Sequence, residues 1–190
     1  ANPVGRVASV SEEITQYLSR GEEMKTILKL GRAGKIPLRI THNDTKFNNI
    51  LLDENDKALC VIDLDTVMPG YVHYDFGDAI RTVTNTAAED EKELSKVRMD
   101  ISLFKAYARG YLSETGKTLN QVEKEYLAFA PKLITYTIGI RFLTDFIDGD
   151  NYFKIHHEFH NLQRTRAQLK LVMSMEEQYG EMQKIISDLV

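Results

Sequence analysis

The chain has 190 residues, 43% hydrophobic and 27% charged, which is enough to bury the core of one domain. Its formal net charge of −4 provides no basic face for nucleic acid, and no apolar run is long enough to span a membrane. The only cysteine, Cys60, excludes an internal disulfide and is expected to be a buried strand thiol, which favours a cytoplasmic protein.

The residues before His42 predict one helix followed by a linker. Apolar residues recur at helical spacing over residues 10–30, so this whole stretch is expected to be helical. Its ends are marked by capping and stop residues, namely Ser9 or Ser11 before it and Gly31, Gly34 and Pro37 after it. These residues contain no Gly-rich loop that could cover a phosphate and no series of strands.

An acidic loop at residues 42–49 has the spacing H-x-D-x-x-x-x-N. Phosphoryl transfer needs a carboxylate that accepts or orients a hydroxyl proton, and hard oxygen ligands that hold magnesium. We expect Asp44 to be the catalytic base, Lys46 to offset phosphoryl charge and Asn49 to bind the metal. His42 is expected to be structural and to hold the loop in place.

Two short apolar runs after the loop predict a β-hairpin. Residues 49–52 and 58–62 favour strands, and the polar residues 53–57 between them favour a turn. A hairpin returns the chain to its starting point, so Asn49 and Asp63 should be neighbours that share one magnesium, with Asp65 as a further ligand. The alternative is that Asp44 caps a turn and Asp63 ends a strand, without metal or transfer.

The remainder of the chain is expected to be helical. One helix is expected over residues 75–85, followed by an acidic connection over 86–93 and a second helix over 99–112 that ends near Gly116. Asn120 should cap a long segment, 122–147, which Pro131 interrupts or kinks. His160 or Asn161 should open the last helix.

The catalytic loop resembles that of protein kinases, in which Asp, Lys and Asn have the same offsets, and is more similar to that of the aminoglycoside phosphotransferase and choline kinase superfamily. Within it, four segments are most similar to bacterial N-acetylhexosamine 1-kinases, some of whose relatives are labelled mucin-desulfating proteins: residues 42–52, 61–70, 75–78 and 141–145. The similarity runs from about residue 40 to about residue 175. It implies ATP and Mg²⁺ as cofactors and an amino sugar as the acceptor.

Asp75-Phe76-Gly77 spells the D-F-G motif of protein kinases, but Asp63 already occupies the metal position. The superfamily places such an Asp at the start of the next helix. The resemblance therefore implies that Asp75 is structural, either as a helix N-cap or as an anchor whose carboxylate binds backbone amides of the catalytic loop.

The stretch around Arg141, Asp145 and Tyr152 closely resembles the sugar kinases, which implies that these residues bind substrate. Arg141 is either a substrate contact or a paired structural arginine. Tyr152 could stack on a pyranose ring, bind an acetamido group or simply pack.

His156 and His160 have helical i,i+4 spacing, but the zinc-binding order H-E-x-x-H is not met, which favours a polar helix start over a metal site.

The sequence therefore predicts a mainly α protein with small β-hairpins (α+β), the C-terminal helical lobe of a protein-kinase-like fold. A single lobe is expected over residues 1–190, with a leading helix and linker at 1–36, the catalytic loop and metal hairpin at 37–70, and a helical subdomain at 71–190. The N-terminal ATP-binding lobe of the same polypeptide is expected to lie outside this chain, which would leave the isolated lobe inactive.

The expected reaction is ATP- and magnesium-dependent phosphorylation of the anomeric hydroxyl of N-acetylglucosamine or N-acetylgalactosamine to the sugar 1-phosphate. Two alternatives remain. The chain could be a kinase for an aminoglycoside, choline or another small alcohol, or a non-catalytic kinase-like binding lobe.

Overall fold

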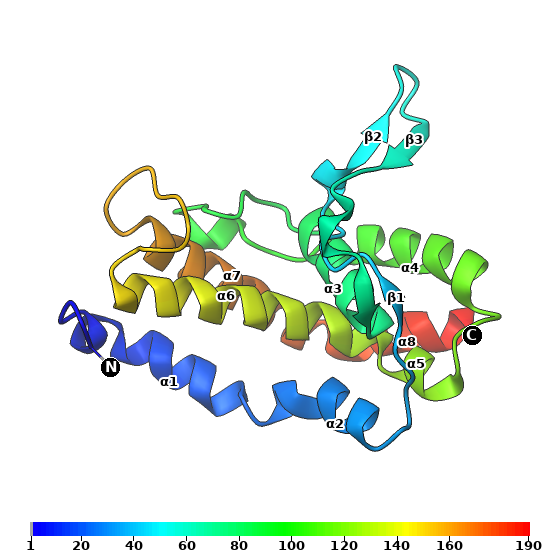
Figure 1. The fold of residues 1–190 in the computed structure, drawn as a ribbon, viewed down its shortest axis with the longest axis horizontal. Helices are drawn as coiled ribbons and strands as arrows, with labels where there is room; N and C mark the ends of the chain where they lie inside the picture. The colour runs from blue at the N-terminus through cyan, green and yellow to red at the C-terminus, as the bar shows by residue number, and fades with distance from the viewer. Residues whose placement is uncertain (1) are drawn as a thin grey trace.

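The computed structural model describes residues 2–190 and shows a helical body from which one β-hairpin projects (Figure 1). Helices α6 and α7 lie side by side along the middle of the body, with α1 and α2 along one side of it (Figure 1). The mainly α fold with small β pairs is thereby confirmed. The helices are α1 (Ser11–Arg20), α2 (Thr26–Arg32), α3 (Val72–Val83), α4 (Ile101–Thr115), α5 (Gln121–Glu125), α6 (Ala130–Asp148), α7 (His160–Glu177) and α8 (Tyr179–Leu189).

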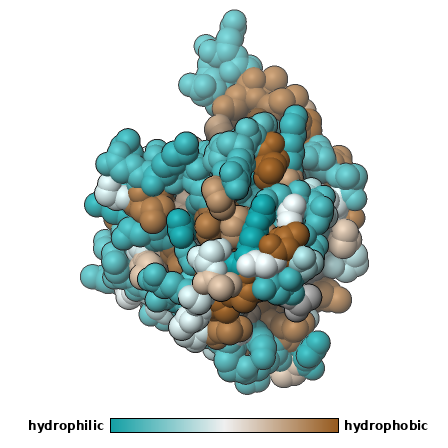
Figure 2. Space-filling model, turned by 90° about the vertical axis from the view of Figure 1, so that its left-hand side faces the viewer, coloured by the Kyte–Doolittle hydropathy of each residue, from teal (hydrophilic) through white to brown (hydrophobic). Residues whose placement is uncertain are grey.

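The strands form two separate antiparallel pairs. β1 (Arg39–Thr41) pairs with β4 (Met68–Gly70), and β2 (Ile50–Leu52) pairs with β3 (Ala58–Val61) as the predicted hairpin. The β2–β3 hairpin rises away from the helices, and apolar surface lies just below its polar tip (Figures 1 and 2). Cys60 is exposed rather than buried, so that prediction was wrong, because no helical layer within residues 2–190 covers the hairpin.

The core has two clusters of buried side chains that meet along α6 and α7. One cluster joins α3, α4, α7 and α8 and is centred on Phe76, whose ring lies 5.0 to 6.2 Å from three other aromatic rings. The other joins α1, α6 and α7. Full burial of a phenylalanine contributes about 2–3 kcal/mol, so Phe76 fixes α3 firmly in the body.

Gly77, next to Phe76, allows α3 to approach the start of α6. A Cβ at this position would lie 2.5 Å from the carbonyl oxygen of Ala130, which is closer than real contacts allow. The Phe and Gly of the D-F-G string are therefore explained by packing between helices.

The prediction of a single helix over residues 10–30 was wrong, because the first helix, α1, ends at Arg20. The Tyr136 hydroxyl donates to the carbonyl oxygen of Tyr17, the acceptor that the amide of Gly21 would use in a continuous α-helix. Gly21 donates instead to Leu18, and a short 3₁₀ turn leads into α2. Neither Ser9 nor Ser11 caps α1, which has Val10 at that position.

The later helices follow the predicted pattern closely. Asn120 begins α5 with a capping box to Glu123, Pro131 lies in the first turn of a new helix, α6, and α7 begins at His160. The interruption of the long segment is thus confirmed. Helix α8 follows α7 as a separate helix that the sequence did not predict. Every helix in residues 2–190 is too short or too polar to cross a membrane.

Candidate functional site

The loop between β1 and β2 is anchored on α3 by Asp75. The backbone amides of His42 and Asn43 donate to the two carboxylate oxygens of Asp75 at 2.8 and 2.7 Å. Thr45 donates its hydroxyl to the Asp75 carbonyl oxygen at 2.6 Å. Asp75 lies inside α3, whose N-cap is Tyr71, so of the two roles left open the contacts support the loop anchor.

Two residues in the left-handed backbone conformation shape the chain at the site. Asn43 has φ 64° and Asp63 has φ 66°, a conformation that Asn and Asp tolerate better than most residues. His42 links the loop to the hairpin, because its Nε2–H donates to the carbonyl oxygen of Ile62 at 2.9 Å. The backbone amide of Ile62 in turn donates to the carbonyl oxygen of Asn49 at 2.9 Å, which places Asp63 beside the end of the loop.

The side chains of Asp44, Lys46 and Asn49 meet in one cluster. Lys46 Nζ lies 2.6 Å from Asp44 Oδ2, and Asn49 Nδ2 donates to the same oxygen at 2.9 Å. Burial raises the pKa of Asp44, but the hydrogen bonds from Lys46 and Asn49 outweigh it and hold that pKa below its ordinary value. Asp44 is therefore a carboxylate at neutral pH, and its Oδ1 accepts no hydrogen bond from residues 2–190.

Asp63 approaches this cluster from the end of the hairpin. Its Oδ2 lies 3.8 Å from Lys46 Nζ, so the ammonium group sits between two carboxylates, and nearly half of the Asp63 side chain is exposed. Asp65 is exposed on the 3₁₀ turn Leu64–Thr66, and within residues 2–190 no hydrogen bond or ion pair joins it to the cluster.

A cavity of about 450 Å³ opens next to Asp44, a volume suited to a small organic ligand. Its polar and charged lining comes from the loop, the 3₁₀ turn before α2, α3 and α6: Lys25, Asn43, Asp44, Tyr74, Asp78, Arg81, Thr137 and Arg141. Apolar side chains complete it: Met24, Leu28, Leu133, Ile134 and Ile138. The predicted base and one predicted substrate residue, Arg141, thus line the same cavity.

Sequence reasoning missed two charged residues of this cavity, Asp78 and Arg81. Arg81 donates through Nε (3.0 Å) and Nη2 (2.9 Å) to Asp78 Oδ1, and through Nη1 (2.8 Å) to Glu89. Both Asp78 and Arg81 are buried, although a helix normally turns charges toward water. The available signal was an Asp and an Arg three residues apart on an otherwise apolar helix face.

Arg141 carries no carboxylate partner within residues 2–190. Its guanidinium lies 5.6 Å from the ring centre of Tyr152 and 5.3 Å from that of Phe153, and Nη2 donates to the Tyr152 hydroxyl at 3.3 Å. It therefore lacks the ion pair expected of a structural arginine. Arg141 also lines a second cavity, of about 410 Å³, together with Tyr152, whose side chain is largely exposed.

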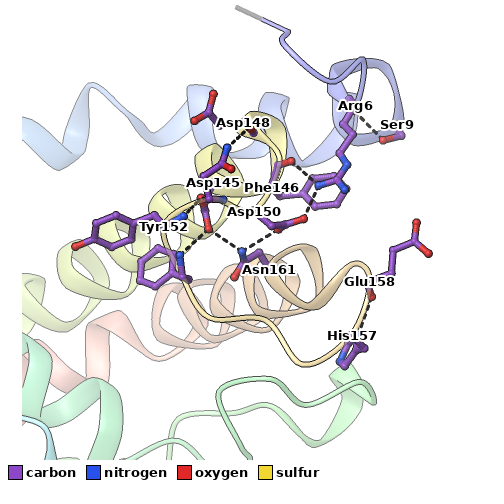
Figure 3. Close-up of polar contacts among 12 residues, drawn as sticks. Arg6, Ser9, Asp145, Phe146, Asp148, Asp150, Tyr152, His157, Glu158 and Asn161 are labelled. Atoms are coloured by element: carbon purple, nitrogen blue, oxygen red, sulfur yellow. Dashed lines mark hydrogen bonds and ion pairs between the residues drawn. The ribbon is translucent and has the colours of Figure 1, made fainter.

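The carboxylate of Asp145 is fully used by the protein. Three backbone amides of the turn after α6 donate to it at 2.8 to 2.9 Å, those of Asn151, Tyr152 and Phe153, and Asn161 Nδ2 donates at 2.8 Å (Figure 3). These contacts support a positioning role, in which Asp145 holds Tyr152, rather than direct contact with a substrate.

The histidines around the start of α7 form hydrogen bonds within the protein. His160 donates through Nε2–H to Asp90 at 3.0 Å, and its Nδ1 accepts the backbone amide of His156. Both ring nitrogens are therefore occupied. In the described part of the chain, no three His, Cys, Asp or Glu side chains are grouped so that they could hold a metal ion.

In a comparison with protein-family models, residues 9–119 match the phosphotransferase enzyme family (APH). This stretch is more than half of the chain and contains the acidic loop, the β2–β3 hairpin and α3. Arg141, Asp145 and Tyr152 lie outside it.

Proposed function

Because the chain belongs to the phosphotransferase enzyme family, we propose that it contains the catalytic centre of a small-molecule kinase that phosphorylates N-acetylhexosamines. The acceptor is N-acetylglucosamine or N-acetylgalactosamine, the donor is ATP with Mg²⁺, and the product is the sugar 1-phosphate. One observation carries the proposal: Asp44 lies between the Lys46 and Asn49 side chains on one side and a monosaccharide-sized cavity on the other.

Asp44 acts on the attacking hydroxyl. Its ionised carboxylate orients the anomeric hydroxyl and accepts its proton while the sugar oxygen bonds to the γ-phosphorus. The bond from that phosphorus to the bridging oxygen breaks, and ADP leaves with the electron pair. Lys46, held against Asp44, offsets negative charge on the phosphoryl group as it transfers.

The oxygen atoms of Asn49 and Asp63 fit a magnesium ion. Asn49 uses its amide nitrogen within the protein, which leaves Oδ1 without a hydrogen bond in residues 2–190, and the Asp63 carboxylate is accessible. Hard oxygen ligands of this kind suit Mg²⁺, and Asp65 is a further ligand nearby in the sequence. When bound, the ion neutralises phosphate charge and orients the nucleotide.

The charges of the cavity favour a neutral, hydroxyl-rich acceptor. Two carboxylates line it against three cationic side chains, those of Lys25, Arg81 and Arg141. Asp44 and Asp78 are already paired with Lys46 and Arg81, so a polycationic aminoglycoside would find no unpaired carboxylate there. Choline would find one aromatic lining residue, Tyr74, instead of an aromatic cage. N-acetylated sugars carry no charge, and Arg141 offers hydrogen-bond donors to them in this cavity. Tyr152 lines the neighbouring cavity that shares Arg141, where it offers an aromatic surface to the acetamido group.

A substrate screen on the native full-length protein tests the proposal. ADP release should be fastest with N-acetylglucosamine or N-acetylgalactosamine, slower with glucose and galactose, and at background with choline and kanamycin. Mild acid should release the new phosphate from the product, as it does from anomeric phosphates and not from 6-phosphates. Preference for choline or kanamycin would contradict the sugar assignment, and no turnover with any acceptor would favour a binding lobe.

A further inference from the structure

Asp78 lies in the wall of the Asp44 cavity with one carboxylate oxygen unused. Only 8% of the residue is exposed, and both of the Arg81 donors that reach it bind the same atom, Oδ1. Oδ2 accepts no hydrogen bond from residues 2–190, and part of its surface remains accessible. Since Asp78 lines the cavity, this oxygen is open to whatever occupies it.

The orientation of Asp78 is fixed by its surroundings. Arg81 is held by Asp78 on one side and by Glu89 at 2.8 Å on the other, so the guanidinium cannot rotate freely. Phe76 and Gly77 hold this turn of α3 against the body. A free carboxylate oxygen on a rigid element, beside the proposed base, is typical of a preorganised ligand contact.

The electrostatics place Asp78 in the same site as Asp44. Burial raises the pKa of Asp78, Arg81 opposes this effect, and the nearby Asp44 carboxylate raises the pKa further. A largely buried carboxylate oxygen without a donor is costly to desolvate. A hydroxyl donor on a bound acceptor would satisfy it and form a charge-assisted hydrogen bond.

We propose that Asp78 is a specificity-determining residue whose Oδ2 accepts a hydrogen bond from a second hydroxyl of the acceptor, while Asp44 acts on the first. The site then selects acceptors with at least two hydroxyls in reach of these carboxylates, that is, sugars rather than mono-alcohols. The inference rests on the proposed sugar-kinase function and extends it to one more contact.

The test compares wild type with D78N, using the preferred N-acetylhexosamine and its set of monodeoxy analogues. Asparagine keeps the size of the side chain and an oxygen for Arg81, but replaces the free acceptor by a donor. We expect the KM for the complete sugar to rise by about 10-fold or more and kcat to change by less than about 3-fold. For one analogue, the one that lacks the contacted hydroxyl, wild type and D78N should have the same KM.

Two further variants separate binding from structure. E114Q, at an exposed carboxylate on α4 that does not line the cavity, should keep wild-type KM values. D78N R81Q removes both halves of the buried pair, so no unpaired guanidinium remains if D78N alone folds poorly, and it should show the same insensitivity to one deoxy position.

The possible failures are distinguishable. If D78N raised the KM equally for every analogue, or for none of them, the role of Asp78 would be overturned while the proposed sugar-kinase function would stand. If wild type neither binds nor phosphorylates any N-acetylhexosamine in the set, the proposed function itself fails, and the Asp78 contact fails with it.

Discussion

The side-chain amide of Asn49 donates to both the carbonyl oxygen and Oδ2 of Asp44, at 2.8 and 2.9 Å. This pair of contacts holds the proposed base and leaves Asn49 Oδ1, the proposed metal ligand, without a hydrogen bond in residues 2–190. N49A should therefore raise the Mg²⁺ concentration for half-maximal activity by about 10-fold or more. Activity titrated with Mg²⁺ measures this, with N55A at the exposed hairpin tip as the control. An unchanged Mg²⁺ dependence would remove Asn49 from the metal site.

Asp75 should control the order of the acidic loop at residues 42–49. D75N leaves a single side-chain oxygen for two backbone donors, so the amides of His42 and Asn43 should exchange hydrogen faster by about 10-fold or more. Hydrogen exchange resolved to single amides checks this, while amides in α7 serve as the internal reference. Unchanged protection at both positions would show that Asp75 does not anchor the loop.

The close approach of α3 and α6 predicts a matched pair of glycine substitutions. G77A should destabilise the fold by about 2 kcal/mol or more, since the new methyl group meets the Ala130 carbonyl at 2.5 Å. G110A, within α4, meets no atom within 4 Å and should be stabilising by about 0.5–1 kcal/mol. Thermal and urea unfolding measure both, and equal effects would contradict the packing described.

Buried His73 should make the fold sensitive to acid. Burial lowers the pKa of His73 to about 4, so below the ordinary value of 6.5 the unfolded chain takes up a proton that the folded protein does not. Neutral His73 therefore causes no loss of stability above pH 6.5, but the free energy of unfolding falls as the pH drops toward 4, by about 2 kcal/mol at pH 5. H73Q should remove this part of the pH dependence in urea unfolding at pH 7 and pH 5. If the free energy of unfolding changed equally between pH 7 and pH 5 in wild type and H73Q, His73 would not be the source of the acid sensitivity.

Features encoded by neighbouring residues were predictable from the sequence. The loop around Asp44, the β2–β3 hairpin, the cap at Asn120 and the start of α7 at His160 all follow from local spacing and turn chemistry. The break at Gly21 was not predictable, because Tyr136, far along the chain, takes the carbonyl of Tyr17. Long-range contacts override local propensity in this way.

Burial explains the other differences. The exposure of Cys60 depends on which layers cover the hairpin, which a strand pattern does not reveal. Asp78 and Arg81 were missed because the periodicity of charged residues does not show that a pair faces a cavity. The contacts of Asp145 depend on a left-handed turn at Gly149 that brings three amides to one carboxylate. The site roles, the division of the chain and the separate nucleotide-binding lobe stay predictions.

The turnover of D44N tests the central claim most directly. Asparagine preserves the shape of the side chain but cannot accept the proton, so phosphorylation of the preferred N-acetylhexosamine should fall by about two orders of magnitude or more. Sugar binding measured by calorimetry should persist, and D56N in the hairpin turn should match wild type. Turnover of D44N within a few-fold of wild type would contradict Asp44 as the base, and with it the account of this site.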